Sequence, residues 1–140
     1  PAAHTCLGEG ASPALFIENA PEGTRQFALI TEDPDFEDGP YTYWILWGIS
    51  SASGAVPHGV PRGTYESGDL RQGRSDDREV GYLAPCPQEG ETHRYRFEAY
   101  ALDAAEIPGL DRAVDRDTFD SLIEDHIIGV GALTGIVSRN

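Results

Sequence analysis

The sequence contains no lysine: its ten basic residues are all arginine, against 24 acidic residues, and the net charge is −14. Such a surface repels the phosphate backbone of nucleic acids, whose binding needs a cationic patch that releases counterions. It is equally unsuited to anionic lipid surfaces. The excess of carboxylates is typical of a protein kept soluble in concentrated salt, where charge repulsion is screened. We therefore expect no nucleic-acid partner and a cytoplasm rich in salt.

Methionine is also absent, and no apolar run reaches the length of a membrane-spanning helix. Because the sequence has no methionine, the question of whether a leader has been removed stays open. Because it has no long apolar run, we expect no integral membrane segment. A length of 140 residues, with 16 glycines and 10 prolines, suits one loop-rich domain, 1–140, with a real hydrophobic core.

Cysteine is scarce: Cys6 and Cys86 are the only two. Two cysteines are too few for a disulfide framework, and their spacing matches no zinc pattern. They are either free thiols or one bridge. The four histidines are scattered without a metal-binding spacing, so we expect neither a metal site nor a cofactor.

Three segments rich in aromatic and β-branched residues predict strands, at 26–31, 42–50 and 93–102. The second is apolar on both faces and should be central in a sheet covered on both sides. Simple alternation puts Trp44 and Leu46 on one of its faces and the remaining apolar residues on the other, namely Tyr43, Ile45, Trp47 and Ile49. In the third strand, His93 and Tyr95 share a face.

One helix is predicted near the C-terminus, with N-cap candidates from Asp115 to Asp117. Its amphipathic stripe consists of Phe119, Leu122, Ile123, His126 and Ile127. Glycines should end the helix, and 132–137 is interpreted as a last short strand. The long stretch 51–92 is rich in Gly, Pro, Asp and Arg, so it is either functional or contains strands that pattern reading misses. The fold class is mainly β with a C-terminal helix.

Two segments that contain candidate functional residues lie directly after the first predicted strand and directly before the third. Asp33 and Asp35 flank a proline that forces a turn, which by itself indicates an Asx-type turn with solvated carboxylates. Cys86 lies between two prolines, shortly before His93 and Tyr95. It could be a nucleophile with His93 as its base, but a small cysteine that packs as an apolar residue is the more common case.

Several motifs in a fixed order resemble those of the phosphatidylethanolamine-binding protein family, in particular its smaller bacterial and archaeal members related to Raf kinase inhibitor protein. The first motif starts at His4-Thr5-Cys6 and ends at Ser12-Pro13, and the second runs from Phe27 into Asp33-Pro34-Asp35. The others are Tyr43-Trp44-Ile45-Leu46, the run from Gly73 through Pro85-Cys86-Pro87 to His93-Arg94-Tyr95, and, near the C-terminus, His126 with Leu133-x-Gly135. The resemblance covers nearly the whole chain.

The resemblance implies a β fold of two packed sheets with a Greek-key element, few short helices and a small pocket for anions such as phosphate or a phosphorylated headgroup. It assigns the pocket carboxylate to Asp33 and an anion donor to His93, with Tyr95 beside it. It makes Pro85 and Cys86 a wall that offers a backbone amide. It also places Tyr41 at the mouth of the pocket and puts Tyr43 where the family has its first pocket histidine.

The exchange of that histidine for Tyr43 replaces a cationic donor by a neutral hydroxyl, which should weaken anion binding. The leading hypothesis is a non-enzymatic protein that binds a small anionic ligand, either phosphate-like or a carboxylate. The alternative is a protein-interaction module that inhibits a kinase or protease, and a Cys–His hydrolase built on Cys86 ranks third. Whether the chain forms a homodimer stays open.

The charge balance makes one prediction that needs no structure. If the carboxylates are an adaptation to salt, the melting temperature rises as KCl increases to molar concentrations, because the Debye length falls to about 3 Å at 1 M and the repulsion is screened. Thermal melting followed by circular dichroism across this range checks it. A melting temperature that stays constant or falls contradicts the adaptation to salt.

Overall fold

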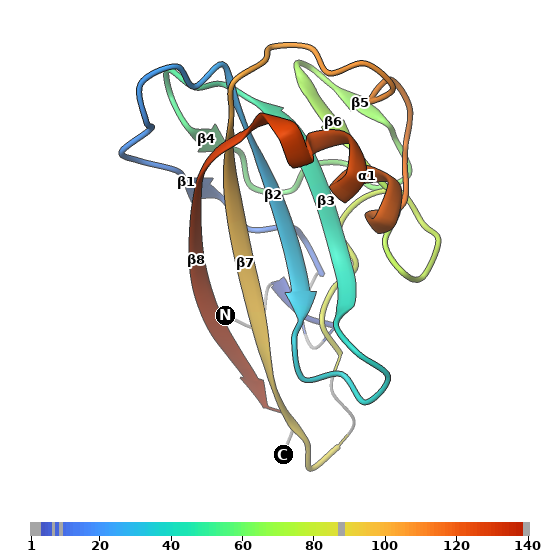
Figure 1. Ribbon diagram of the computed structural model, residues 1–140. Helices are drawn as coiled ribbons and strands as arrows, with labels where there is room; N and C mark the ends of the chain where they lie inside the picture. The colour runs from blue at the N-terminus through green and yellow to red at the C-terminus, as the bar shows by residue number, and fades with distance from the viewer. Residues whose placement is uncertain (1–3, 7, 9, 87–88, 139–140) are drawn as a thin grey trace.

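The computed structural model describes residues 4–6, 8, 10–86 and 89–138. Long strands alternate with loops, and one helix precedes the last strand (Figure 1). The strands are β1 (Leu15–Phe16), β2 (Gln26–Asp33), β3 (Tyr41–Ile49), β4 (Ala55–Val56), β5 (Glu66–Ser67), β6 (Leu70–Gln72), β7 (Thr92–Leu102) and β8 (Ile127–Ser138). The helix α1 (Arg116–Ile123) continues into a short 3₁₀ helix, Glu124–His126. No helix in the described part of the chain is long and apolar enough to cross a membrane.

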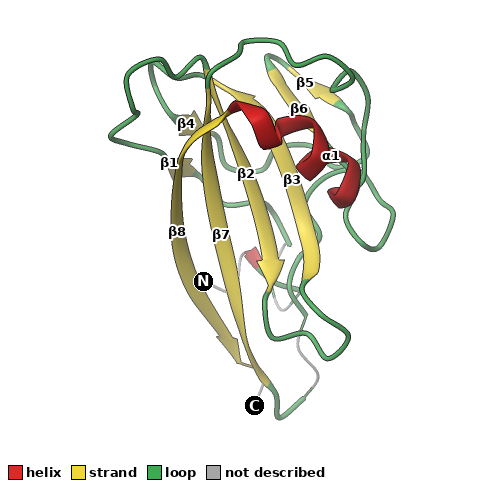
Figure 2. Ribbon diagram, viewed as in Figure 1, coloured by secondary structure: helices red, strands yellow, loops and turns green. Residues whose placement is uncertain are grey.

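The strands form two sheets (Figure 2). The larger has six antiparallel strands in the order β5-β6-β3-β2-β7-β8, and the smaller pairs β1 with β4. Within the larger sheet, β2, β3 and β6 lie next to one another in that order. Strand β7 follows β6 in the sequence but pairs with the opposite edge of β2, which is a Greek-key order. The predicted two-sheet β fold with a Greek-key element and a C-terminal helix is confirmed.

Strand β2 lies at the centre of this fold, and all eight of its residues are buried. On one face Ala28 and Ile30 pack with Phe119 and Ile123 of α1. On the other face Phe27 and Leu29 belong to a second cluster, which β4 and the loop after it complete with Val56 and Val60. Each large apolar side chain buried in this way contributes roughly 1.5–3 kcal/mol. The sheet is therefore covered on both sides, as the apolar pattern of its central strands predicts.

Strict alternation fails near the end of β3, where Gly48 has a φ of +75°. Phe27 pairs with Ile49 and Leu29 pairs with Leu46, so three steps along β3 match two along β2. This β-bulge turns Ile49 to the face of Trp44 and Leu46 rather than to the predicted face of Ile45 and Trp47. A side chain at Gly48 is excluded, since its Cβ would lie 2.3 Å from the backbone oxygen of Asp69.

Two further predictions need correction or completion. The helix begins as predicted, with the side chain of Asp115 accepting from the backbone N–H of Thr118, but it ends at Ile123 rather than near Ile127. Strand β8 then begins at Ile127 rather than at residue 132, because pairing with β7 outweighs the helical periodicity. The stretch 51–92 contains β4, β5 and β6, which pattern reading missed.

The structure resolves the state of the cysteines: Cys6 and Cys86 form a disulfide. Because the two residues lie 80 positions apart, the chain-entropy account gives the bond about 4.5 kcal/mol of stabilisation. Cys86 is exposed, so it does not fill space as a buried thiol, which corrects the packing prediction. Its sulfur is bonded and offers no thiolate, so the hydrolase that uses Cys86 as nucleophile loses its chemical basis.

Candidate functional site

The end of the sheet at which β2 finishes gathers most of the predicted site residues. Asp33 is the last residue of β2 and pairs with Tyr41, the first residue of β3. His93 and Tyr95 lie near the start of β7, on the other side of β2. Because neighbouring strands in this sheet are antiparallel, the end of β2 and the starts of β3 and β7 meet at one edge, at the bottom of Figure 1.

Asp33 and His93 are in direct contact, with 2.8 Å between His93 Nδ1 and Asp33 Oδ2. Asp33 is fully buried, whereas about a quarter of the His93 side chain remains exposed. The second carboxylate oxygen of Asp33 accepts from the backbone N–H of Asp35 at 2.9 Å. Asp33 therefore forms the Asx-type turn that its position in the sequence indicates, but its carboxylate is buried rather than solvated as predicted, because it also makes the pairing with His93 that the family resemblance implies.

The pKa of His93 is raised above its ordinary value of 6.5, chiefly by the hydrogen bond to Asp33. A second carboxylate adds to the effect: Glu91 Oε2 lies 3.5 Å from His93 Nε2. The imidazole is thus held between two acids, one buried and one exposed, which favours the protonated form near neutral pH. Glu91 was not among the predicted site residues, although it precedes His93 by two residues and so shares its side of the chain.

Tyrosine rings line the site beside this pair. Tyr43 lies between Tyr41 and Tyr95, with ring centroids 5.3 Å and 5.2 Å away, and Tyr95 lies 6.4 Å from the His93 ring. Burial raises the pKa of both the Tyr43 and the Tyr95 hydroxyl, so both stay neutral donors. Phe36, which the sequence analysis missed, extends this row with its ring 4.7 Å from Tyr41.

Tyr43 reaches this face because β3 has a second irregularity. Thr31 pairs with Trp44 but Glu32 pairs with Thr42, which leaves Tyr43 as an extra residue. Alternation alone assigns Tyr43 to the face of Ile45 and Trp47, while the family resemblance assigns it to the pocket. The bulge favours the second assignment, since the ring of Tyr43 contacts Tyr95.

The remaining two predicted residues, Pro85 and Cys86, are tied to the N-terminal segment. The backbone N–H of Cys6 donates to Pro85 O at 3.2 Å, next to the disulfide. The chain passes close to the tyrosines just before this point, because the backbone N–H of Leu83 donates to Tyr43 O at 2.9 Å. The role of Pro85 and Cys86 as a pocket wall stays a prediction, and Pro87 of that wall lies outside the described residues.

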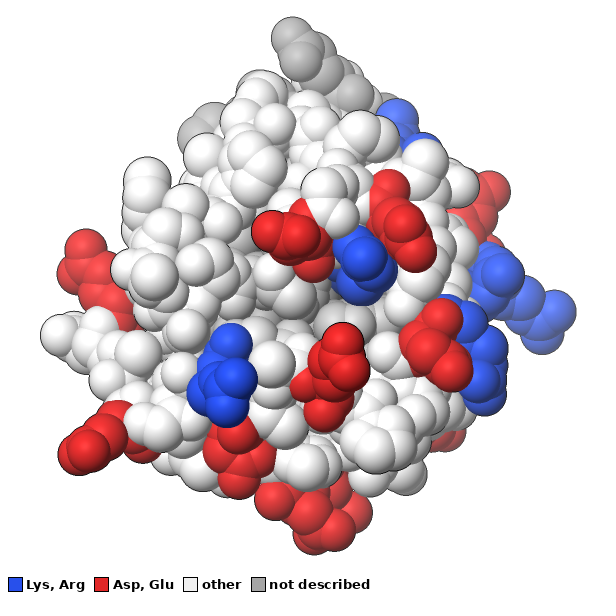
Figure 3. All heavy atoms as spheres, turned by 90° about the horizontal axis from the view of Figure 1, so that it is seen from above, with Lys and Arg blue, Asp and Glu red and all other residues white. Residues whose placement is uncertain are grey.

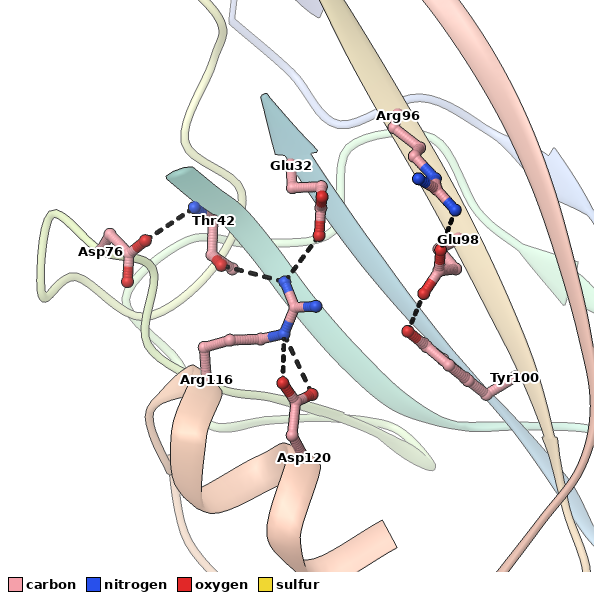
Figure 4. A network of polar contacts seen from close by, with 8 residues as sticks. All are labelled: Glu32, Thr42, Asp76, Arg96, Glu98, Tyr100, Arg116 and Asp120. Carbon is pink, nitrogen blue, oxygen red and sulfur yellow. Dashed lines mark hydrogen bonds and ion pairs between the residues drawn. The ribbon is translucent and has the colours of Figure 1, made fainter. Parts of the chain in front are cut away.

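The opposite face of the same strand ends carries an ionic network that the sequence analysis did not find (Figure 4). Arg116 Nη1, from α1, donates to Glu32 Oε1 at 2.9 Å and to Thr42 Oγ1 at 3.1 Å. The Nε atom of the same guanidinium bonds the carboxylate of Asp120. Asp76 accepts from the backbone N–H of Thr42 at 2.8 Å. Glu32 and Thr42 directly neighbour Asp33 and Tyr43 in sequence, so the network fixes the strands that present the site.

The described residues contain no group of three or more His, Cys, Asp or Glu side chains suited to holding a metal ion. The site instead consists of one cationic donor, one buried carboxylate that orients it, and neutral hydroxyls on an aromatic wall. This set of groups suits hydrogen bonding to a small anion.

Comparison with known proteins identifies the family of the chain. The chain matches the family described as phosphatidylethanolamine-binding protein over residues 1–138. The chain belongs to this family. Among its relatives, a UPF0098 protein from Archaeoglobus fulgidus is 39% identical over 141 residues, which cover 100% of this chain. The chain spans only about half, 47%, of that relative's length.

Solved structures of family members show the same fold. The phosphatidylethanolamine-binding protein homologue CT736 from Chlamydia trachomatis is 31% identical, with a TM-score of 0.85 over 100% of this chain and 89% of that one. Escherichia coli YBCL, described as a member of the mammalian PEBP family, is 26% identical, with a TM-score of 0.87 over 100% of this chain and 90% of its own. A lipoprotein from Mycobacterium tuberculosis, LppC, is 36% identical over 106 residues, which are 75% of this chain and 50% of LppC.

The contact between Asp33 and His93 predicts how the histidine titrates. In Asp33→Asn the pKa of His93 falls back toward 6.5, because the strongest cause of its elevation is lost. In Glu91→Gln the fall is smaller, since that carboxylate is more distant and more exposed. Titration of the imidazole resonances by NMR, with His93→Ala used for assignment, measures both.

The same shift has a consequence for stability. A histidine whose pKa is raised on folding stabilises the protein fully below its unfolded pKa, near 6.5, and this stabilisation disappears as the pH rises through the folded value.

For the NMR titration, an unchanged pKa of His93 in Asp33→Asn would show that the pair does not control the imidazole.

Proposed function

We propose that this chain is a non-enzymatic binding protein that holds a small anion, such as phosphate, a phosphorylated headgroup or a carboxylate, at His93. The observation that carries the proposal is the hydrogen bond of 2.8 Å from the partly exposed His93 to the fully buried Asp33. A buried carboxylate beside an imidazole fixes the orientation of the ring and favours its charged form. The second ring nitrogen, Nε2, then carries an N–H that can donate to a ligand in place of the exposed Glu91 carboxylate, which lies 3.5 Å away.

The tyrosines support the binding of an anion in two ways. Tyr43 and Tyr95 are almost completely buried, so their rings keep water away from one side of the imidazole. Their hydroxyls are neutral and hydrogen-bonded to each other, so only one of the two has a proton left to donate to a bound anion, and neither adds positive charge. With Tyr43 in the place of a second histidine, His93 is the main cationic donor, and the affinity should be weak and dependent on pH.

The remaining charges act against an anion. Glu91 Oε2 lies 3.5 Å from His93 Nε2, the atom that a ligand would contact, and the chain as a whole carries −14. A ligand must displace the Glu91 carboxylate before it can accept from that nitrogen. Glu91 is half-exposed, so its contact with His93 is a weak competitor rather than a permanent block.

Phosphate titrations by isothermal calorimetry test the site. Binding is expected to be stronger at pH 6 than at pH 8, since His93 loses its charge as the pH rises, and to disappear in His93→Ala. Glu91→Gln should tighten binding by up to about fivefold, because an exposed ion pair is worth about 0–1 kcal/mol. The matched control is His126→Ala, since His126 also pairs with an aspartate, Asp103, at 2.9 Å. Equal affinity in wild type and His93→Ala would refute the proposal.

The disulfide bears on where the chain works. Disulfides persist in oxidising compartments and are rare in the cytoplasm. The bond between Cys6 and Cys86, together with a relative described as a lipoprotein, supports an extracytoplasmic location instead of the cytoplasm that the charge balance predicted. We propose this location as part of the same function.

Trapping of thiols in the native cells tests the location. Cells treated with N-ethylmaleimide before lysis should yield chains that carry no maleimide, because both sulfurs are engaged. A Cys6→Ser variant, whose Cys86 has no partner, is the control and should gain one maleimide. Modification of both cysteines in the wild-type chain would place it in a reducing compartment.

A further inference from the structure

Strand β8 (Ile127–Ser138) has one edge that no other strand covers in the described part of the chain. It is the terminal strand of the six-stranded sheet, at the left of Figure 1, and its other edge pairs with β7. That pairing runs from Gly129 to Ser138 without a bulge. In a regular antiparallel strand, every second residue turns its backbone N–H and C=O away from the neighbouring strand. The outer edge of β8 is therefore a straight row of hydrogen-bonding groups to which a further strand can be added.

This edge lacks the features that usually prevent a strand from pairing with another chain, namely short length, charged side chains, proline and bulges. Strand β8 has 12 residues, and none of them is charged or a proline. Lysine, which is especially common on protected edges, is absent from the whole chain. The opposite edge of the sheet is different, because β5 has only 2 residues and one of them is the exposed Glu66. Of the two edges of this sheet, only that of β8 is thus suited to pairing.

Apolar side chains are exposed beside the same edge. Val130 is 61% exposed and Ile128 is 38% exposed, although both belong to β8. Phe16 of β1 is 75% exposed and lines an apolar hollow together with Gly131 and Ala132 of β8. These three side chains are most of the large apolar groups that the described residues expose. Apolar surface gathered at one place marks an interaction site, whereas apolar residues scattered singly do not.

The charge of the molecule indicates which partner fits this edge. The chain carries −14, and seen from above, carboxylates cover more of the surface than arginines do (Figure 3). Two copies of such a chain repel each other, and the repulsion is weakest where both present a segment without charge. Strand β8 is such a segment, and contact between two β8 strands places uncharged residues opposite uncharged residues. A basic partner, by contrast, finds no carboxylate on this strand, so charge complementarity does not select one.

We propose that the outer edge of β8 pairs with the same edge of a second copy of this chain. The two β8 strands run antiparallel about a two-fold axis that passes near Ala132, at the middle of the strand, and they join the two sheets into one. The backbone groups of both free edges then bond each other, and Val130 loses much of its contact with water. Assembly stops at two copies, because the joined sheet ends on both sides in the short, charged β5. The interface is independent of the proposed anion site.

Sedimentation equilibrium of the wild-type chain tests the pairing. We expect a species of twice the chain mass of 15.2 kDa, with a dissociation constant below about 1 mM. Between 0.1 and 1 M KCl this constant should fall, because the Debye length drops from about 10 to about 3 Å and the repulsion between the copies is screened. A monomer at all concentrations up to about 1 mM overturns the proposal and leaves the edge to a different chain. Species larger than a dimer, or a dimer that salt dissociates, also overturn it.

Charged variants make the test specific to β8. Ala132→Lys and Ala132→Glu each place two like charges near the two-fold axis, so each should raise the dissociation constant at least about tenfold. An equimolar mixture of the two should form the dimer again, since opposite charges then meet, and this recovery also shows that both variants are folded. The matched controls are Ala52→Lys and Ala52→Glu, at an exposed alanine of another loop, which should dimerise like the wild type.

A further variant tests the interface without adding charge. Val130→Ser removes exposed apolar surface from β8 and should weaken the dimer, while the melting temperature of the monomer stays nearly unchanged because the side chain is mostly exposed. The proposal is overturned if both Ala132 variants dimerise as well as the wild type. It is equally overturned if their mixture stays monomeric although each variant keeps the circular dichroism spectrum of the wild type.

Discussion

The complete burial of β2 is the constraint on which the rest of the structure depends. This strand has apolar layers on both faces and a neighbouring strand on either side, so all of its residues lose contact with water. Its last residue is a carboxylate, and Asp33 is carried into the same dry environment. A buried carboxylate without partners is costly, and here the cost is met by the imidazole of His93 and a backbone N–H. The position of the site thus follows from the position of the strand.

Charge organises the two faces of the strand end in different ways. Glu32 and Asp33 are adjacent, and they point to opposite sides of the sheet. Glu32 pairs with Arg116, which is always charged and ties α1 to the sheet. Asp33 pairs with a histidine, whose charge depends on pH. The arginine, with its permanent charge, stabilises the packing of the helix on the sheet, whereas the histidine, with its pH-dependent charge, belongs to the proposed anion site.

The sequence was sufficient for the strands of the centre and for most of the site, because strong β propensity and a family motif pointed to the same residues. It was insufficient wherever pairing between distant segments overrules a local pattern. The periodic stripe around His126 predicts more helix, but contact with β7 draws Ile127 into β8. The bulges at Tyr43 and Gly48 arise from the register between β2 and β3, and no periodicity within one strand contains that information. Arg116 was missed for the same reason, since its partner Glu32 lies 84 positions away in the sequence. Glu91 is a different case, because it lies two positions before His93 and the alternation of side chains along a strand was enough to find it.

The bond between Cys6 and Cys86 divides the chain in a way that the sheet does not. Strands β1 to β6 lie inside the covalent loop, whereas β7, α1 and β8 lie outside it. The sheet interleaves the two parts, since β2 from inside the loop pairs with β7 from outside. A single backbone cut within the loop therefore leaves one covalent molecule, whose pieces remain joined through sulfur. When the chain is pulled from its two ends, the segment between the cysteines bears no tension, and only the part outside the loop can lengthen.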